Sequence, residues 1–320
     1  MMGILQHHKL YDFTTEKGTR YPELSVSFQI FGKKLYSAPI VLVNHALTGN
    51  SDVVSEKKGW WKEIVGEGKL IDLNKYTVIA LNIPGNGYDN IFFNNYKDFS
   101  VKDIAEIFYS VLAELNVQKL HAIIGGSLGG SIAWQIACLY PSFSEYIVPI
   151  ASDWKATDWV IGHSAIQENI LLNSKQPLED ARKMAMLFYR TPASFTQKFN
   201  RTKTEDKLQF NVESWLNHHG KKLNERYKLK AYLLMNHLLT TIRIEEDDLS
   251  QIQSKIVQIA VNSDLYYVAD ENIKTQKILN QKGIENEYYE IQSIHGHDAF
   301  LIEHQQITNF LQHVFLIIKK

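Results

Sequence analysis

The chain has 320 residues, 45% of them hydrophobic and 22% charged, which is usual for a globular protein with one full α/β core and an insertion. Its 34 lysines and arginines balance 35 aspartates and glutamates, which excludes the basic surface that binds nucleic acid or an anionic membrane. A single cysteine, Cys138, excludes an internal disulfide. Because Met1 to Phe13 has no apolar leader and no segment reaches membrane-spanning length, we expect a cytoplasmic location.

Several stretches of the chain have the composition of strands covered on both faces of a parallel sheet. They are Leu24–Phe31, Ile40–Asn44, Tyr76–Asn82, His121–Ile124, Tyr146–Ala151, Ile256–Val261 and Asn286–Ile291. Between them, Val101–Asn116 carries an apolar stripe at helical spacing, with Ser100 as a suitable N-cap. Gln276–Gly283 ends in a glycine suited to the residue after a helix, and Gln305–Ile318 is typical of a terminal helix. This alternation predicts an α/β fold with a doubly wound, mostly parallel sheet.

The stretch from Asp153 to Asp248 breaks the alternation. Its apolar residues recur at helical spacing and few of them are β-branched, so we predict a helical lid inserted between two core strands. The core then comprises residues 1–152 and 249–320, and the lid residues 153–248. A lid over an active site excludes water and shapes the site for a second substrate.

The run Gly125-Gly126-Ser127-Leu128-Gly129-Gly130 lies between the apolar stretch His121–Ile124 and a helical segment, Ser131–Tyr140. A G-x-S-x-G turn from strand to helix is the nucleophile elbow, in which small neighbours tolerate the strain that exposes a serine hydroxyl. An ordinary glycine-rich turn is the alternative for this motif alone. The elbow predicts a serine-dependent enzyme of acyl transfer or hydrolysis, with Ser127 as nucleophile.

Two further residues complete a candidate triad. A serine needs a histidine base, and the histidine needs a carboxylate that holds its tautomer. Asp264 follows the strand Ile256–Val261, and His297 follows the strand Asn286–Ile291. Ser127, Asp264 and His297 therefore stand at strand ends in the order serine, acid, histidine.

Several motifs together closely resemble the homoserine O-acetyltransferases of the α/β-hydrolase superfamily. The resemblance covers nearly the whole chain and implies an α/β-hydrolase fold with an inserted helical lid. It implies transfer of an acetyl group from acetyl-CoA to the hydroxyl of L-homoserine, a step toward methionine, through an acyl-serine. It implies acetyl-CoA as donor substrate, with no tightly bound cofactor and no metal. The matching runs are Asn44–Ser51, Gly68–Asp72, Gly125–Gly130, Gly296–Leu301 and, in the lid, Ala185–Arg190, Val212–Leu216 and Gly220–Lys222.

The resemblance assigns the catalytic roles residue by residue. Asp153 also follows a strand-like run, but the match at Gly296–Asp298 and the chain order favour Asp264 as the acid. The assigned residues are Ser127 as nucleophile, His297 as base, Asp264 as orienting acid, and the backbone N–H groups of Leu47 and Leu128 as the oxyanion hole.

The resemblance also implies contacts with the amino-acid acceptor. Arg226 is expected to bind its carboxylate, because a guanidinium fork fits that group bidentately. Asp298 is expected to meet its ammonium group, and Thr48 and Tyr232 to add polar contacts. For Arg226 and Tyr232, a solvated helix face is the alternative.

Two runs depart from the family pattern. A short loop, Ile83–Asp89, stands where the family has a longer glycine- and threonine-rich loop. Around Arg226 the chain reads Arg-Tyr-Lys-Leu-Lys, where the family typically has Arg-Phe-Asp-Ala-Asn. Homoserine or serine as acceptor, and acetyl or succinyl as the acyl group, therefore stay open at this point.

Other functions share most of these features. An esterase or thioesterase would use the same triad and admit water, and a noncatalytic relative would keep only the fold. The partners expected are small molecules, an acyl-CoA and an amino acid, and neither nucleic acid nor membrane. A homodimer through the lid is a further hypothesis.

Overall fold

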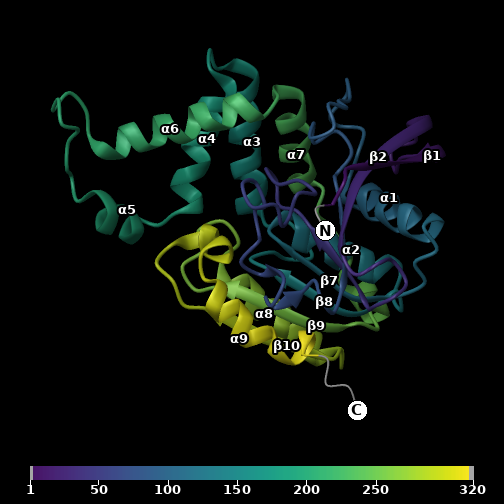
Figure 1. The fold of residues 1–320 in the computed structure, drawn as a ribbon. Helices are drawn as coiled ribbons and strands as arrows, with labels where there is room; N and C mark the ends of the chain where they lie inside the picture. Colours follow the sequence, from purple (N-terminus) through teal and green to yellow (C-terminus); the bar gives the residue numbers. More distant parts are fainter. Residues whose placement is uncertain (1–2, 317–320) are drawn as a thin grey trace.

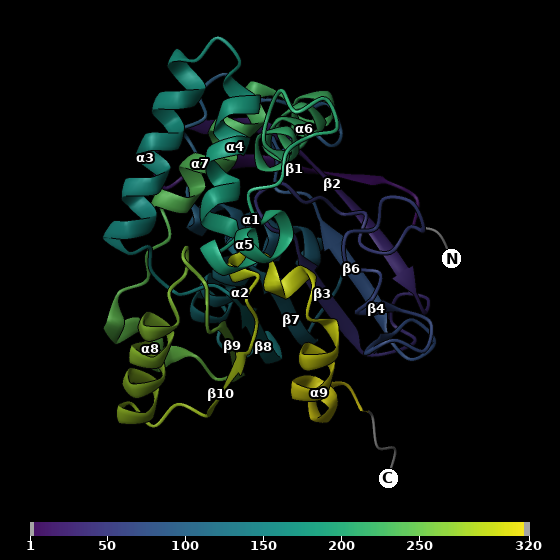
Figure 2. The ribbon, with the colours of Figure 1, turned by 90° about the vertical axis from the view of Figure 1, so that its left-hand side faces the viewer.

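The computed structural model describes residues 3–316, and within them eight strands form one sheet (Figures 1 and 2). The strand order is β1-β2-β6-β3-β7-β8-β9-β10. The pairs β1–β2 and β2–β6 are antiparallel and the other neighbours are parallel, so the predicted mostly parallel sheet is confirmed. The strands are β1 (Gln6–Thr14), β2 (Arg20–Gly32), β3 (Ile40–Asn44), β6 (Thr77–Leu81), β7 (Leu120–Gly126), β8 (Ser144–Ile150), β9 (Lys255–Val261) and β10 (Asn286–Ile291).

The strands β3 and β10 have the predicted bounds, and the other predicted strands differ only at their ends. The sequence pattern does not predict β1. Among its residues only Leu10 is buried, because β1 is an edge strand, so it lacks the apolar run of a central strand. The strands β4 (Val65–Gly66) and β5 (Ile71–Asp72) are also not predicted, because this separate two-stranded sheet is too short to leave a sequence pattern.

Helices cover both faces of the sheet, which is why its central strands are mostly apolar. Leu42 packs into the core shared with α1 (Val101–Glu114), α2 (Leu128–Leu139) and α8 (Ala269–Gln281). Its neighbours in β3, Val41 and Val43, pack into the core on the other face, shared with α9 (His304–Phe315).

The helix ends follow their sequence signals in part. Ser100 caps α1, and its hydroxyl and the Asp103 carboxylate form a reciprocal capping box, which confirms the predicted N-cap. Gly283, at φ +68°, follows the end of α8 as predicted, although α8 begins at Ala269 rather than Gln276. The helix α9 ends at Phe315, and residues 317 and 318 of the predicted terminal helix lie outside the described part.

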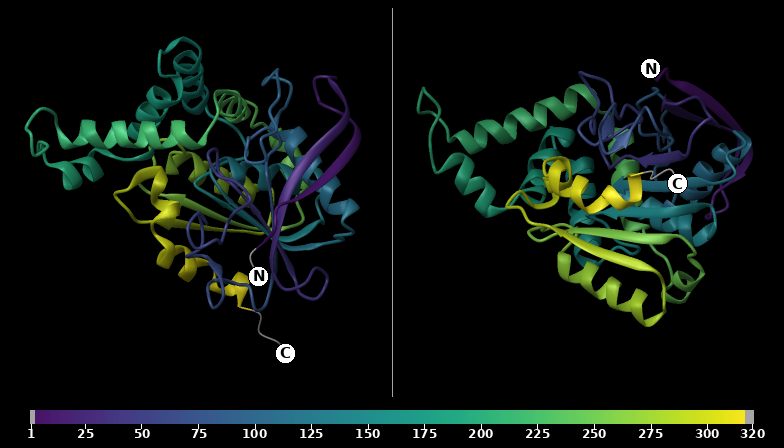
Figure 3. Two further views of the ribbon diagram at one scale, coloured as in Figure 1. Left: turned by 45° about the horizontal axis from the view of Figure 1, so that its top comes forward. Right: turned by 60° about the horizontal axis from the view of Figure 1, so that its bottom comes forward.

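The predicted lid segment is helical (Figures 1 and 3). In it α4 packs on α3 and also on η2 (Gly296–Leu301), the turn that carries His297, while α5 and α6 project away from the body. No helix within residues 3–316 is long and apolar enough to cross a membrane. The lid elements are α3 (Asp158–Asn173), α4 (Pro177–Tyr189), α5 (Pro192–Phe199), α6 (Asn211–Arg226) and α7 (Leu229–Thr240), followed by η1 (Glu246–Gln251).

Candidate active site

Ser127 lies in the tight turn between β7 and α2. Its backbone has φ +54° and ψ −128°, a strained conformation for any residue other than glycine. The turn lies so close to the end of β3 that a Cβ on Gly129 would fall 2.4 Å from the Asn44 carbonyl oxygen, so glycine is required there. The helix α2 begins at Leu128 rather than at Ser131, directly after the serine. This is the geometry of a nucleophile elbow and not of an ordinary glycine-rich turn.

Three side chains from distant parts of the chain form one line of hydrogen bonds. Ser127 Oγ lies 2.9 Å from His297 Nε2, and His297 Nδ1 lies 2.7 Å from Asp264 Oδ2. The other carboxylate oxygen of Asp264 accepts from the backbone amides of Tyr266 and Tyr267 at 2.6 and 2.9 Å. A carboxylate held in this way keeps the hydrogen on Nδ1, so Nε2 is free to accept the serine proton.

Aromatic rings surround His297. Ser127, Asp264 and His297 are all buried. Such a lining excludes water and strengthens electrostatic interactions within it. The rings lie with their centroids 5.2 to 5.7 Å from the imidazole and belong to Tyr189, Tyr266, Tyr267 and Phe300.

Asp153, the other candidate for the catalytic acid, makes its hydrogen bonds with residues outside the candidate triad. Its Oδ1 accepts from the Trp154 amide and from the Thr275 hydroxyl, both at 2.9 Å. Burial raises the pKa of Asp153 to about 7, against these hydrogen bonds. The carboxylate in contact with His297 is therefore that of Asp264.

Leu47 and Leu128 occupy the positions expected of oxyanion donors. Leu47 lies in the loop after β3, and Leu128 is the first residue of α2. In the described residues 3–316, neither backbone amide donates to a protein acceptor. Because buried amides are almost always paired, two free N–H groups beside a serine are suited to bind a developing anion.

Asp298 follows the histidine and lies among arginines. Its Oδ2 is 3.8 Å from Arg190 Nη1, and both side chains are mostly buried. Burial raises the pKa of the Asp298 carboxyl, while the charges of Arg182 and Arg190 oppose the shift. An ion pair at 3.8 Å leaves carboxylate lone pairs that a substrate ammonium group could use.

Arg182 and Tyr189, to which the sequence motifs assign no role, also lie near the site. The Arg182 guanidinium lies 5.6 Å from the centre of the Tyr189 ring, and its positive charge acts on Asp298 and on buried Tyr232. Arg182 and Tyr189 are two turns apart on α4, so they lie on the same face of that helix. The spacing of Arg182 and Tyr189 is visible in the sequence, at the run Ala185–Arg190 that matches the family, and could have indicated that the two residues share a face.

Two of the other predicted acceptor contacts, Arg226 and Thr48, meet at the loop after β3. Arg226, at the end of α6, is exposed and donates from Nη1 to the Thr48 carbonyl oxygen at 2.9 Å. The Tyr227 hydroxyl donates to the Leu47 carbonyl oxygen at 2.9 Å. Tyr232 is 1% exposed, so it does not lie on a solvated face. The Arg226 Nη1 group is thus already hydrogen-bonded to a backbone carbonyl of the protein.

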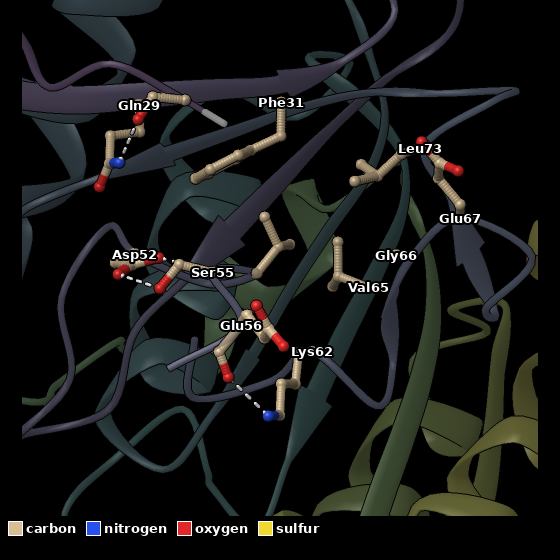
Figure 4. Close-up of a pocket in the computed structure, with 12 residues that line it drawn as sticks. Gln29, Phe31, Asp52, Ser55, Glu56, Lys62, Val65, Gly66, Glu67 and Leu73 are labelled. Carbon is tan, nitrogen blue, oxygen red and sulfur yellow. Dashed lines mark hydrogen bonds between the residues drawn. The ribbon is translucent and has the colours of Figure 1, made fainter. Parts of the chain in front are cut away.

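A hollow of about 390 Å³ lies apart from these residues, beside β2 and β4 (Figure 4). Asp52 there accepts from the Ser55 hydroxyl at 2.6 Å, and Lys62 donates to the Glu56 carbonyl oxygen at 2.8 Å. None of its lining residues belongs to the candidate triad.

Comparison with known proteins identifies the fold and the family of this chain. The sequence profile of the alpha/beta hydrolase fold matches residues 39–301. A homoserine O-acetyltransferase from Chloroherpeton thalassium is 31% identical over 93% of this chain and 85% of its own. The chain belongs to the homoserine O-acetyltransferase family of α/β hydrolases. Another such enzyme, from Cyclobacterium marinum, is 29% identical over 94% of this chain and 92% of its own.

Solved structures place this homoserine O-acetyltransferase family member on a fold that transferases and esterases share. The homoserine O-acetyltransferase from Bacillus anthracis matches with a TM-score of 0.88 at 19% identity, over 100% of this chain and 99% of that one. The acetyl esterase MekB matches with a TM-score of 0.81 at 18% identity, over 98% and 96%. The fold by itself therefore does not separate transfer from hydrolysis.

Proposed function

We propose that this protein transfers an acetyl group from acetyl-CoA to the side-chain hydroxyl of L-homoserine, as a step of methionine biosynthesis. The observation that carries the proposal is the hydrogen-bonded line from Ser127 through His297 to Asp264, beneath a lid, in a chain of this family. No tightly bound cofactor takes part, because the donor thioester is itself a substrate, and the cytoplasmic location remains a prediction.

In the first half-reaction the serine is acylated. Ser127 Oγ attacks the thioester carbonyl carbon, and His297 Nε2 takes the hydroxyl proton. The amides of Leu47 and Leu128 bind the oxyanion of the tetrahedral intermediate. When this collapses, the carbon–sulfur bond breaks and His297 returns the proton to the departing thiolate. The product is acetyl-Ser127.

In the second half-reaction homoserine replaces CoA. His297 takes the proton of its hydroxyl, whose oxygen attacks the acetyl carbon, and Ser127 leaves with that proton. The substrate ammonium group pairs with Asp298. The substrate carboxylate pairs with Arg182, which forms no ion pair within residues 3–316 and whose charge acts on Asp298. Arg226, Tyr232 and Thr48 are proposed to line the same acceptor site.

Release of free thiol from acetyl-CoA, measured with and without homoserine, tests the proposal. Release that depends on the acceptor supports the transferase. Release without an acceptor, at the same rate, would identify an esterase or thioesterase instead. No release with acetyl-CoA, followed by release with succinyl-CoA, would replace the proposed donor.

The proposed domain division is a core of residues 1–152 and 249–320 with a lid of 153–248. We also propose a homodimer through the lid. The α5–α6 arm projects from the body (Figure 3). It carries Leu208, which is 84% exposed, and a hollow of about 440 Å³ lined by Phe195, Phe199 and Phe210, among others. Exposed apolar surface of this kind often marks an interface. Sedimentation of the wild type and of Leu208→Glu would test it, since a monomeric wild type contradicts the dimer.

A further inference from the structure

The peptide group between Ala46 and Leu47 carries the Leu47 N–H and is held in place by hydrogen bonds to its carbonyl oxygen. In a trans peptide the C=O of Ala46 and the N–H of Leu47 point in opposite directions. The Ala46 carbonyl oxygen accepts from the Gly49 amide at 2.9 Å and lies 2.8 Å from His45 Nδ1. These bonds set the plane of the peptide and so direct the Leu47 N–H away from them.

The His45 ring links the Ala46 carbonyl to a second buried backbone group. Its Nε2 accepts from the Ile83 amide at 3.1 Å, which requires an unprotonated Nε2 and a hydrogen on Nδ1 for the Ala46 carbonyl. Burial lowers the pKa of His45 to about 4, so the ring stays neutral. Asn86 Nδ2 lies 3.3 Å from the same nitrogen. The short loop Ile83–Asp89, which departs from the family pattern, thus braces the loop after β3.

The peptide on the other side of Leu47 is held by the lid. The Tyr227 hydroxyl donates to the Leu47 carbonyl oxygen at 2.9 Å, and Arg226 Nη1 donates to the next carbonyl, that of Thr48, also at 2.9 Å. Tyr227 is 6% exposed, and its ring packs edge-on against Tyr232 of α7 at 5.9 Å. Its hydroxyl position is therefore set by the junction of α6 and α7.

We propose that Tyr227 is a positioning residue that ties the lid to the oxyanion hole, with Arg226 in support. The core sets the plane of the peptide before Leu47 and the lid holds the peptide after it, so Leu47 is fixed from both sides when the α6–α7 junction is seated. This inference rests on the proposed role of the Leu47 amide. It differs from a role in acceptor binding because an oxyanion forms in both half-reactions, whereas the acceptor takes part in only one.

The variant Tyr227→Phe removes one hydroxyl and keeps the buried ring. Tyr76→Phe is the matched control, because the Tyr76 hydroxyl also donates at 2.9 Å to a buried backbone carbonyl, that of Phe315, outside the site. Acylation is measured as the p-nitrophenol burst from p-nitrophenyl acetate, and transfer as thiol release from acetyl-CoA with homoserine. Affinity for a trifluoromethyl ketone analogue of acetyl-CoA, which forms a tetrahedral adduct with the serine, reports the hole directly.

For Tyr227→Phe we expect acylation and transfer each to slow by about tenfold, less than the loss of a whole oxyanion donor. The inhibition constant of the ketone should rise by a similar factor and the KM values should stay within about twofold, since the substrate ground state carries no oxyanion. Tyr76→Phe should lower the melting temperature to a similar extent and leave all three readouts unchanged.

Several results would overturn the inference. They are equal rates for Tyr227→Phe and the control, or a rise in the KM for homoserine with acylation unchanged. If Tyr227→Phe does not fold, Arg226→Met, at an exposed position, replaces it, because methionine cannot donate to the Thr48 carbonyl. Arg226 is also proposed to line the acceptor site, so the acylation burst is the deciding readout for this variant. A slower burst supports the inference, whereas a loss confined to transfer would leave Arg226 with the acceptor role alone and overturn it. A wild type that releases no thiol from acetyl-CoA in the presence of homoserine would overturn the proposed function, whereas wild-type acylation and transfer that the variants leave unchanged overturn this inference alone.

Discussion

Replacing Asp264 by asparagine is the sharpest test of the triad, because the hydrogen-bond partners around this side chain determine the orientation of the new amide group. In the wild type, Oδ1 accepts from the amides of Tyr266 and Tyr267, while Oδ2 accepts from His297 Nδ1. An asparagine must keep its oxygen toward the two backbone amides, since its NH₂ group cannot accept from them. The NH₂ group then faces Nδ1 and drives the ring hydrogen to Nε2, where the imidazole cannot accept the proton of Ser127.

The expected loss in turnover is about 10⁴-fold, the magnitude of this exchange in a serine protease triad, or about 5.5 kcal/mol of transition-state stabilisation. Asp153→Asn is the control. Its oxygen can still accept from the Trp154 amide and the Thr275 hydroxyl, so we expect turnover within about tenfold of the wild type. Thiol release from acetyl-CoA with saturating homoserine measures both variants. The opposite ranking would show that Asp153 and not Asp264 is the catalytic acid.

The remaining predictions use the same assays. In the wild type, the peptide that contains residue 127 should gain the mass of one acetyl group, and the kinetics should be ping-pong. Ser127→Ala should abolish both this mass increase and thiol release. Intersecting double-reciprocal lines for the wild type would contradict an acyl-enzyme. Asp298→Asn and Arg182→Gln should each raise the KM for homoserine, with a loss of about 2 to 5 kcal/mol in kcat/KM for Asp298→Asn, while pre-steady-state acylation stays near wild type. Equal losses in both half-reactions would mean that these residues hold the His297 loop instead. Because the pKa of Asp153 rises to about 7 in the folded protein, the folded state binds more protons than the unfolded state between about pH 4 and 7. Stability should therefore fall as pH rises through that window, by up to about 4 kcal/mol, and Asp153→Asn should remove this slope in denaturant titrations; an unchanged slope would refute the assignment.

Local patterns in the sequence determined the sheet and its helices. Apolar runs predicted the central strands, because strands covered on both faces leave no polar positions. The glycines around Ser127 predicted the elbow, because only residues without a Cβ fit where Gly129 approaches the Asn44 carbonyl. The edge strand β1 was missed for the converse reason, since one exposed face and a solvated edge remove the apolar run.

The contacts between distant segments were decided by the tertiary structure. Asp153 and Asp264 both follow strands, and the loop conformation after each strand determines which carboxylate contacts His297. The resemblance predicts that Arg226 binds a substrate carboxylate, and only the docking of α6 on the loop after β3 shows that its Nη1 also donates to the Thr48 carbonyl oxygen. The charge of Arg182 acts on Asp298 because α4 packs against the turn that carries His297. Spacing along a helix indicates which residues share a face, whereas the packing of the lid on the core decides what that face meets.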